Sequence, residues 1–581
     1  MTTLCAGGTK PQAADWPWHK GQLTCRALCG SPVPPVWCAL VVQIGTAPSG
    51  SPMAKAPAAG SSNCISSATS ASTAPKRGGR NREKRVTDRR MAAILPDVAA
   101  ARQDIPSQAI RRAIDPAAAA VEIRGLEDPD ITSLSRRTTQ RLRRPQTLFF
   151  SRRLWRRRLV FWGGAIVTGL IGAGFALAAN RASLLFDRVI DFSPWIPLIL
   201  TPVGFLASAI VCRRVFPGAQ GSGIPQAIAA RHVRDPVGRN RLLSLKLTAG
   251  KILLTLFGLA CGASIGREGP TVQVGASIML QAARLGGMGR ERGLILAGSA
   301  AGVAAAFNTP LAGIVFAIEE MGRSYEHRTN GLILSTVILA GIASVALLGN
   351  YSYFGVTNAG IDMLRAWPAV LACGIGGGIG GACFSRIVLA GTKWIRAFVL
   401  RRPNRNTMLV AALAGLVVAV LGIASHGATY GTGYEQARGA LEGLPLDWTY
   451  APMKLLATLV STLSGIPGGI FAPSLSVGAG LGGALVPFFP AIPAGVVVVL
   501  GMAGYFSGVV QAPITAFVII VEMTADHDMV IPLMVASVIG FGTSRLISPQ
   551  PLYHTLAEHF IETARAASAP DTEAEQPEED L

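Results

Sequence analysis

The chain contains 581 residues, of which 50% are hydrophobic and 15% are charged, and its mean hydropathy is +0.41. This composition favours a membrane protein over a soluble enzyme. The formal net charge of +20 would suggest a nucleic-acid partner in a soluble protein, but much of it lies in one segment: ten arginines and no acidic residue occur between Arg136 and Arg158.

Residues 1–150 are rich in Ala, Pro, Ser, Gly and Arg and show no hydrophobic periodicity, so we expect this segment to be disordered. Five of the nine cysteines fall here. Cys25 and Cys29 form one close pair, but no second pair completes a zinc site, and the lack of a signal peptide argues against a disulfide framework. Met91 follows a dense basic stretch and is an alternative start of the chain.

The arginine-rich segment directly precedes the apolar stretch Leu159–Ala179, which is long enough to span a bilayer. Because positively charged flanks stay on the cytoplasmic side, we expect a cytoplasmic N-terminus in the inner membrane of the cell. An RNA-binding basic tail is the alternative interpretation. The scarcity of interleaved aromatic residues argues against it, so we expect no nucleic-acid partner.

From Leu159 to about Phe560 the sequence predicts an all-α polytopic membrane protein with roughly fourteen to eighteen helices, many of them too short to span alone. The run Gly374–Gly381 is expected to let helices pack closely. The apolar stretches after the first one are Ile196–Cys212, Leu247–Leu259, Gly293–Phe307, Leu332–Leu348, Ala369–Cys383, Met408–Ser425, Leu455–Leu463, Ala494–Phe506 and Ile531–Ile547.

A repeat relates the two parts of this region. Shifting the sequence that begins at Lys251 by 203 positions aligns it without a gap with the sequence that begins at Lys454. Such repeats, with apolar segments interrupted by glycine and proline, are typical of secondary transporters and channels whose ligand site lies between two related halves. Further matched pairs are Gly262 and Gly465, Gly266 and Gly469, Pro270 and Pro473, Gly298 and Gly501, Pro310 and Pro513, and Glu319 and Glu522.

Three motifs interrupt the apolar stretches: Gly221–Pro225 (GSGIP), Gly266–Pro270 (GREGP) and Gly469–Pro473 (GIFAP). Each is expected to start a helix inside the membrane, because proline fits the first helical turn and glycine permits close backbone approach. Free N–H groups at converging N-termini favour an anion without a full positive charge, which would hold a permeant ion too tightly. The alternative is that each motif is only a helix kink.

With these motifs the sequence resembles the CLC family of chloride channels and chloride/proton antiporters, over about residues 155–560. GSGIP, GREGP and GxFxP are the family's signatures, and Gln511–Thr524 followed by Pro551-Leu552-Tyr553 is similar to its final helices. The resemblance implies two inverted halves, here residues 151–350 and 351–562, in a homodimer with an independent pore in each subunit.

The resemblance also implies that chloride and protons are the partners, in a lipid bilayer, with no cofactor and no enzymatic activity. We expect no nucleotide-binding CBS pair, because the chain ends soon after Tyr553. Residues 563–581 are expected to form an acidic disordered tail.

The predicted chloride site combines hydroxyl and backbone groups. The resemblance implies that Ser222 coordinates the central chloride through its hydroxyl, which can donate one hydrogen bond. Tyr553 would close the inner side of the same site. From the residues alone, a helix-capping serine and an interfacial tyrosine are the alternatives. The predicted chloride-binding set is completed by Gly223 and Ile224, and by Ile470 and Phe471, which would offer backbone N–H groups.

Glu268, within GREGP, is expected to be the gate. A carboxylate among helix N-termini competes with the anion when charged, and protonation frees the site, so one residue both gates the anion and carries a proton. The alternative is an inconsequential surface pair between Arg267 and Glu268.

Glu320 is the predicted inner proton acceptor, because the resemblance implies that a glutamate here receives protons from the cytoplasm in antiporters. Glu319 is the alternative acceptor. Antiporters often carry acidic residues just after GSGIP, whereas this chain has Gln226 and Ile228 there.

The seven histidines form no HxxxH or HExxH pair, so we expect no metal site. An intramembrane serine hydrolase is unsupported, because Ser425-His426 lacks a flanking nucleophile motif. The sequence therefore predicts a chloride/proton antiporter. The alternatives are a passive, proton-gated chloride channel of the same fold, a fluoride exporter and a purely structural membrane protein.

Overall fold

The computed structural model describes residues 151–288, 291–322, 330–349, 354 and 363–566. The N-terminal segment 1–150 and most of the predicted acidic tail lie outside these residues. The predicted start of the tail at residue 563 is wrong, because the last helix continues to Ala566. Residues 562–566 are mostly good helix formers, and the Thr563 hydroxyl donates to the His559 carbonyl oxygen at 2.9 Å.

Within the described ranges every element is a helix, as predicted, and the only strand-like pairings there are two isolated bridges. The helices of the first half are α8 (Arg152–Phe192), α9 (Pro197–Arg214), α10 (Ile224–His232), α11 (Pro236–Leu242), α12 (Leu245–Ala260), α13 (Glu268–Leu285), α14 (Glu291–Phe307), α15 (Pro310–Phe316), the π-helix η3 (Ala317–Gly322) and α16 (Asn330–Leu348). Those that follow are α17 (Met363–Arg401), α18 (Pro403–Ala424), α19 (Tyr434–Leu441), α20 (Tyr450–Leu463), α21 (Phe471–Leu485), the 3₁₀-helix η4 (Val486–Phe488), α22 (Ala494–Val510), α23 (Pro513–Thr524), α24 (Val530–Ile547) and α25 (Leu552–Ala566).

Eight segments are helical, long and apolar enough to cross a membrane, so the chain is an integral multi-pass membrane protein. Others, such as α10 and α15, are too short to span a bilayer, as predicted. α8 and α17 are much longer than the apolar stretches predicted at Leu159–Ala179 and Ala369–Cys383. Both helices continue past their apolar part through arginine and other polar residues that favour helix. A hydropathy pattern does not detect these polar ends.

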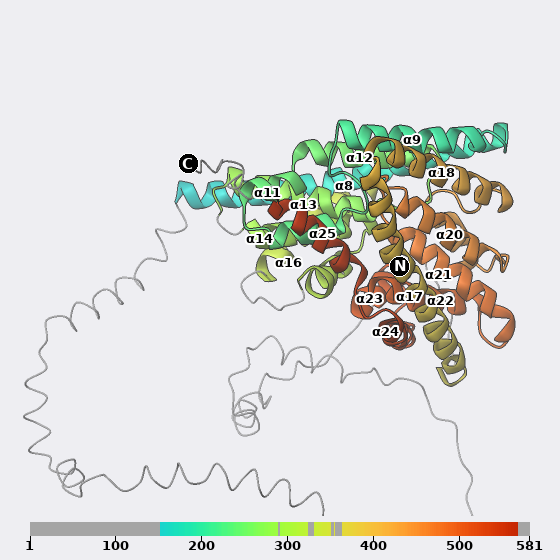
Figure 1. The fold of residues 1–581 in the computed structure, drawn as a ribbon. Coiled ribbons are helices and arrows are strands. Elements are labelled where there is room, and N and C mark those ends of the chain that lie inside the picture. The colour runs from blue at the N-terminus through green and yellow to red at the C-terminus, as the bar shows by residue number, and fades with distance from the viewer. Residues whose placement is uncertain (1–150, 289–290, 323–329, 350–353, 355–362, 567–581) are drawn as a thin grey trace, which may run out of the picture. The chain divides into compact units, whose positions relative to one another are not determined.

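The two halves repeat one packing arrangement. In the first half α8 packs against α13, α14 and α16, and in the second half α17 packs against α21, α22 and α24. The halves meet where equivalent helices pair, α9 with α18 and α15 with α23. The last helix, α25, crosses back and packs against α10. In Figure 1 it lies among the green helices of the first half, near α11 and α13.

Gly266 and Gly469, which are equivalent in the repeat, hydrogen-bond to each other. Each N–H donates to the carbonyl oxygen of the other residue at 2.7 Å, in an antiparallel bridge. Because the two residues are equivalent in the repeat and exchange both hydrogen bonds, a local two-fold axis relates the two halves at this point. The backbone therefore runs in opposite directions through Gly266 and Gly469. The inversion that the resemblance implied is therefore present, although the repeat in the sequence could not reveal it.

Glycines in α17 let three helices approach closely, as predicted for this run. A side chain at Gly374 or Gly378 would meet α24, and one at Gly377 or Gly381 would meet α22. These four positions follow helical spacing and lie on one side of α17. The close packing therefore depends on the absence of side chains along this side.

We expect Gly377→Ala to destabilise the protein by about 1–3 kcal/mol, because overpacked methyl groups force the backbone to shift. The new methyl group would lie 2.5 Å from the Gly504 carbonyl carbon on α22. Gly376→Ala is the matched control, since its methyl group would meet only the Leu481 side chain, at 3.8 Å. Thermal unfolding of both purified variants in one detergent measures the effect. Equal unfolding temperatures would mean that α17 and α22 separate without cost.

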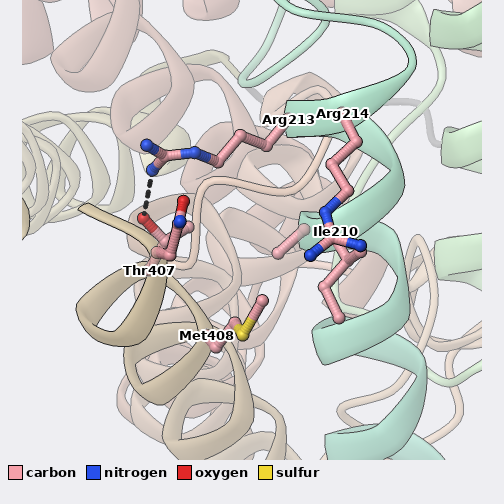
Figure 2. Close-up of a pocket in the computed structure, with 7 residues that line it drawn as sticks. Ile210, Arg213, Arg214, Thr407 and Met408 are labelled. Carbon is pink, nitrogen blue, oxygen red and sulfur yellow. Dashed lines mark hydrogen bonds between the residues drawn. The ribbon is translucent and has the colours of Figure 1, made fainter. Parts of the chain in front are cut away.

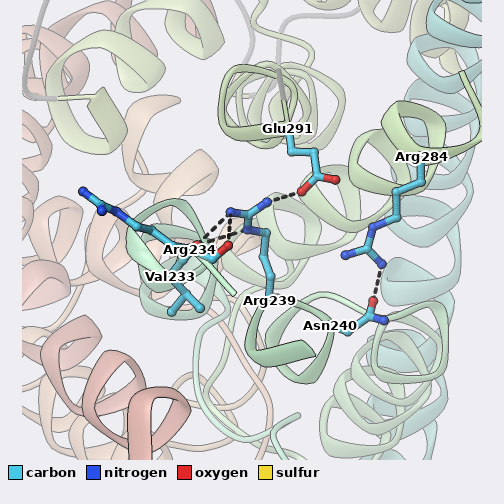
Figure 3. A network of polar contacts seen from close by, with 6 residues as sticks. All are labelled: Val233, Arg234, Arg239, Asn240, Arg284 and Glu291. Carbon is cyan, nitrogen blue, oxygen red and sulfur yellow. Dashed lines mark hydrogen bonds and ion pairs between the residues drawn. The ribbon is translucent and has the colours of Figure 1, made fainter. Parts of the chain in front are cut away.

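A polar network fixes the short helices α10 and α11 (Figure 3). Arg239, on α11, donates to the Val233 carbonyl oxygen at 2.9 Å and pairs with Glu291 at the start of α14. Arg284, on α13, donates to the Asn240 side chain at 2.5 Å. Because α10 begins within GSGIP, this network holds the motif's helix against the first half.

Candidate functional site

The three motifs form helix N-termini, as predicted, and they meet. α10, α13 and α21 begin within GSGIP, GREGP and GIFAP, and Ile224, the first residue of α10, is fully buried. The Gly266–Gly469 bridge joins the loops before α13 and α21. The Gly468 N–H donates to the Gly221 carbonyl oxygen at 3.3 Å, which joins the loop before α10 to the same place. Three helix starts, each with N–H groups that lack an intrahelical acceptor, therefore lie together between the halves.

The loop that carries Ser222 depends on glycine and on Gln226. Gly221 and Gly223 have φ angles of 70° and 104°, which residues with side chains rarely adopt. Gln226 Oε1 accepts from the Gly223 N–H at 3.1 Å, and its Nε2 donates to the Gln220 carbonyl oxygen at 2.6 Å. Gln226, which differs from the acidic residues of many antiporters, thus caps α10 and fixes the Ser222 loop.

Ser222 and Tyr553, both predicted to coordinate chloride, lie close enough to interact through their hydroxyl groups. Both oxygens are buried, and neither makes a hydrogen bond of normal geometry within the part of the chain that the structure describes. Ser222 Oγ lies beside Gly269, where α13 has no side chain to cover it. Two buried hydroxyl groups that face each other without a hydrogen bond of normal geometry are rare in folded interiors, and they suit an acceptor that the protein does not supply, such as an anion.

Phe471, the first residue of α21, is fully buried among aromatic rings. Its ring centroid lies 5.0 Å from that of Phe506 and 5.9 Å from those of Phe316 and Tyr553. This packing fixes the start of α21. The N–H groups of Ile470 and Phe471 stand at the helix N-terminus, where no intrahelical carbonyl accepts from them. Backbone donors are therefore available at the two predicted positions.

Glu268, the first residue of α13, is fully buried. Its carboxylate lies among the backbone N–H groups of Arg267, Glu268 itself and Ala472, at the N-termini of α13 and α21 together. Neither oxygen makes a hydrogen bond of normal geometry with a described residue. The Arg267 side chain is also buried and donates to the Ala176 carbonyl oxygen at 2.7 Å and to Asn180 at 2.5 Å. A surface pair between Arg267 and Glu268 is therefore the wrong interpretation.

Glu319 and Glu320 lie in η3, a π-helical turn of a kind frequent at functional sites. Glu320 is buried, and its Oε1 lies 3.9 Å from Nε2 of His554 on α25. Glu319 is half-buried, and its carboxylate accepts from the Ile514 and Thr515 N–H groups at 3.1 and 2.6 Å. Glu319 is thus bound to the start of α23, whereas Glu320 lies inside the protein beside α25.

Glu522, the equivalent of Glu319, makes the reciprocal contact. Its carboxylate accepts from the Leu311 and Ala312 N–H groups, at 3.0 and 2.6 Å, at the N-terminus of α15. Each half therefore caps a short helix of the other half with a carboxylate, which stabilises the positive end of the helix dipole. The sequence pairs the two glutamates but does not reveal that their contacts are exchanged.

Lys251 and Lys454, which are equivalent in the repeat, are further candidate functional residues that the motifs did not indicate. Both are completely buried. Lys251 Nζ donates at 2.8 Å to the carbonyl oxygen of Gly221, the neighbour of Ser222, and Lys454 Nζ donates at 2.9 Å to that of Gly431. Buried lysines among membrane helices are costly and mark functional elements. The signal in the sequence was a lysine repeated inside apolar stretches.

The loop that Lys454 holds is a second-half counterpart of the Ser222 loop. Gly431-Thr432-Gly433 precedes α19 as Gly221–Gly223 precedes α10, and Gly431 and Gly433 have φ angles of 61° and 74°. The offset from Gly221 to Gly431 is 210 positions instead of 203, so an ungapped alignment misses this pair. The repeat therefore extends further towards the N-terminus of each half than the ungapped alignment, which begins at Lys251 and Lys454.

These features define a membrane transport protein built from two inverted halves, with helix N-termini at their junction. Within the described ranges no group of three His, Cys, Asp or Glu side chains is placed to hold a metal ion. A family model described as "Voltage gated chloride channel" matches residues 203–545. The chain belongs to this family, the CLC family that its motifs resemble, and it is not an enzyme.

Individual relatives agree with this assignment. The H(+)/Cl(-) exchange transporter ClcA of Citrobacter koseri is 30% identical over 432 residues, which cover 69% of this chain and 88% of the relative. Among solved structures, a slow cyanobacterial Cl-/H+ antiporter is 26% identical, with a TM-score of 0.62 over 70% of this chain and 98% of the other. A CLC-type fluoride/proton antiporter is 22% identical, with a TM-score of 0.59 over 69% and 98% of the two chains, and this likeness shows the fold alone.

Proposed function

We propose that the protein exchanges chloride for protons across the membrane, with Glu268 as the gate and Glu320 as the inner proton acceptor. The observation that carries this proposal is the position of the Glu268 carboxylate, which is buried at the N-termini of α13 and α21. An anion and a carboxylate compete for the same N–H groups, because both are stabilised by the positive ends of helix dipoles.

In the proposed cycle, charged Glu268 occupies the anion's place and blocks the path. Protonation removes the charge, so the carboxyl group no longer competes and chloride enters. The chloride then lies between the hydroxyl groups of Ser222 and Tyr553 and the backbone of Ile470 and Phe471, with Gly223 and Ile224 at the start of α10 beside it. Hydrogen bonds from neutral donors hold an anion firmly enough to select it and weakly enough to release it.

Glu320 is assigned the inner end of the proton path because it is the buried member of the glutamate pair and lies beside His554 on α25. Protons would reach Glu268 from Glu320 by a route separate from the inner anion path. A carboxylate in such a place suits proton relay, because ionisable groups inside membrane proteins mark proton pathways.

The names of the relatives support exchange of chloride and protons over a passive channel. ClcA and the cyanobacterial structure are both described as proton/chloride exchangers, and the ClcA of Citrobacter koseri reaches 30% identity. The fluoride/proton antiporter shares the fold at 22% identity, which gives no support for fluoride as the substrate.

We further propose a homodimer in the inner membrane, with the start of α8 on the cytoplasmic side. The dimer follows from the family resemblance. The orientation is supported by the exposed arginines Arg152, Arg156 and Arg158 at the beginning of the first membrane span, because positively charged flanks are retained in the cytoplasm.

Reversal potentials of the purified protein in lipid bilayers test the exchange. We expect a pH gradient at equal chloride concentrations to move the reversal potential away from zero, because chloride and protons move together in a fixed ratio and both gradients drive the current. A chloride gradient alone should give less than the roughly 59 mV per tenfold gradient of a purely chloride-selective path. A reversal potential that follows chloride alone would identify a passive channel and contradict the proposal.

A further inference from the structure

The end of α9 and the start of α18 form a basic cleft, and none of its lining residues belongs to the proposed ion site. Both helices are membrane spans, and they pack side by side. A short turn connects α8 to α9, so α9 ends on the side of the membrane where α8 begins. Arg213, at the end of α9, donates at 2.6 Å to the Pro403 carbonyl oxygen and at 3.1 Å to Thr407 Oγ1 on α18.

The cleft combines apolar and cationic side chains (Figure 2). Its apolar part is lined by Ala209, Ile210 and Met408, and its polar end by Arg213, Arg214, Asn404 and Thr407. Figure 2 shows Arg214 extended along α9 beside Ile210. Guanidinium groups beside methylene and methyl groups match the junction between the phosphate and the acyl chains of a phospholipid.

Arg214 lines the cleft, and two further arginines lie at the start of α18, close to lining residues in the sequence. Arg214, Arg402 and Arg405 are exposed and make no hydrogen bond or ion pair through their side chains with any described residue. Neither α9 nor α18 contains an aspartate or a glutamate. Arg213 is already bound to α18, so it holds the two helices together while its neighbours remain available to a ligand.

We propose that this cleft binds an anionic phospholipid of the leaflet on the side where α8 begins, with the lipid phosphate on Arg214 and Arg402 and an acyl chain along Ile210 and Met408. A phosphate group is the natural partner of clustered arginines, because the planar guanidinium donates two hydrogen bonds to its oxygens.

The source of the phosphate is a lipid rather than a free anion, because the helices around the cleft are exposed on apolar faces. Ile199 and Val203 on α9 and Leu409 and Leu413 on α18 are 74%, 55%, 46% and 53% exposed, which places the outer faces of these two spans against acyl chains. The enclosed part of the cleft is only about 20 Å³, roughly the space of one water molecule. The headgroup therefore lies over the cleft and not inside it.

Native mass spectrometry of the purified full chain in detergent tests the proposal. The probes are phosphatidylglycerol and phosphatidylcholine with identical acyl chains, added in equal amounts. We expect preferential retention of phosphatidylglycerol, and about fivefold weaker retention for each arginine removed in Arg214→Gln and in the double variant Arg214→Gln/Arg402→Gln. Arg214→Lys keeps the charge and should retain most of the binding.

The matched control is Arg241→Gln/Arg292→Gln, which removes two exposed arginines at the end of α11 and the start of α14. It should leave phosphatidylglycerol retention unchanged. An equal loss in this control would mean diffuse attraction to positive charge, and equal retention of both lipids in the parent protein would mean no headgroup recognition; either result overturns the proposal. Displacement by inorganic phosphate would assign the cleft to a free anion and overturn it as well.

Discussion

Glu268→Gln should reduce coupled proton movement by about a hundredfold or more, the range typical of removing a proton-transfer group, while chloride flux persists. The glutamine side chain is neutral at all pH values, so it imitates the protonated gate without exchanging a proton. The substitution also removes the free-energy cost of a buried charge, because the Glu268 side chain is fully buried. Simultaneous chloride and pH measurements on proteoliposomes would record both fluxes.

The control for this substitution is Glu522→Gln, which makes the same chemical change at a carboxylate that caps α15 away from GREGP. This variant should retain proton coupling. Acidification or alkalinisation driven by a chloride gradient in Glu268→Gln would show that the gate lies elsewhere. Loss of chloride flux in a correctly folded Glu268→Gln protein would mean that the residue is required for the anion path itself.

Features that depend on local sequence were predictable. GSGIP, GREGP and GIFAP start helices because glycine supplies the backbone freedom and proline fits the first turn, and the structure starts α10, α13 and α21 there. The pairing of Gly266 with Gly469 was visible as a repeat. Its two-fold exchange of hydrogen bonds was not, because an alignment contains no information about the direction of one half relative to the other.

Features that depend on contact between the halves could not be predicted from the sequence. Glu319 and Glu320 are neighbours with identical chemistry, and only the π-helical turn and the position of α23 distinguish the capping residue from the buried one. The partners of Lys251 and Lys454 are carbonyl oxygens, which leave no trace in the sequence. The lengths of α8 and α17 exceeded the prediction because polar ends of membrane helices resemble loops in composition.

Glu320→Gln should also uncouple the two ions, with a loss of proton flux of about tenfold or more and with chloride flux retained. Glu320 is buried beside α25, and its glutamine replacement cannot take up and release a proton. The chloride path should remain open, because Ser222, Tyr553 and the start of α21 are unchanged. The ratio of chloride to proton flux in proteoliposomes, compared with the parent protein, measures the effect.

Glu319→Gln provides the contrast, because it alters the neighbouring carboxylate in the same π-helical turn. Its expected effect is a loss of stability of about 1–2 kcal/mol, since a charged acceptor at the N-terminus of α23 becomes neutral. Glu522→Gln should lose a similar amount at α15, because the two caps are equivalent in the repeat. Thermal unfolding would record these changes, and both variants should keep the ion coupling of the parent protein. If Glu319→Gln uncouples the ions while Glu320→Gln does not, the inner acceptor is Glu319, and the half-buried cap of α23 also carries the proton.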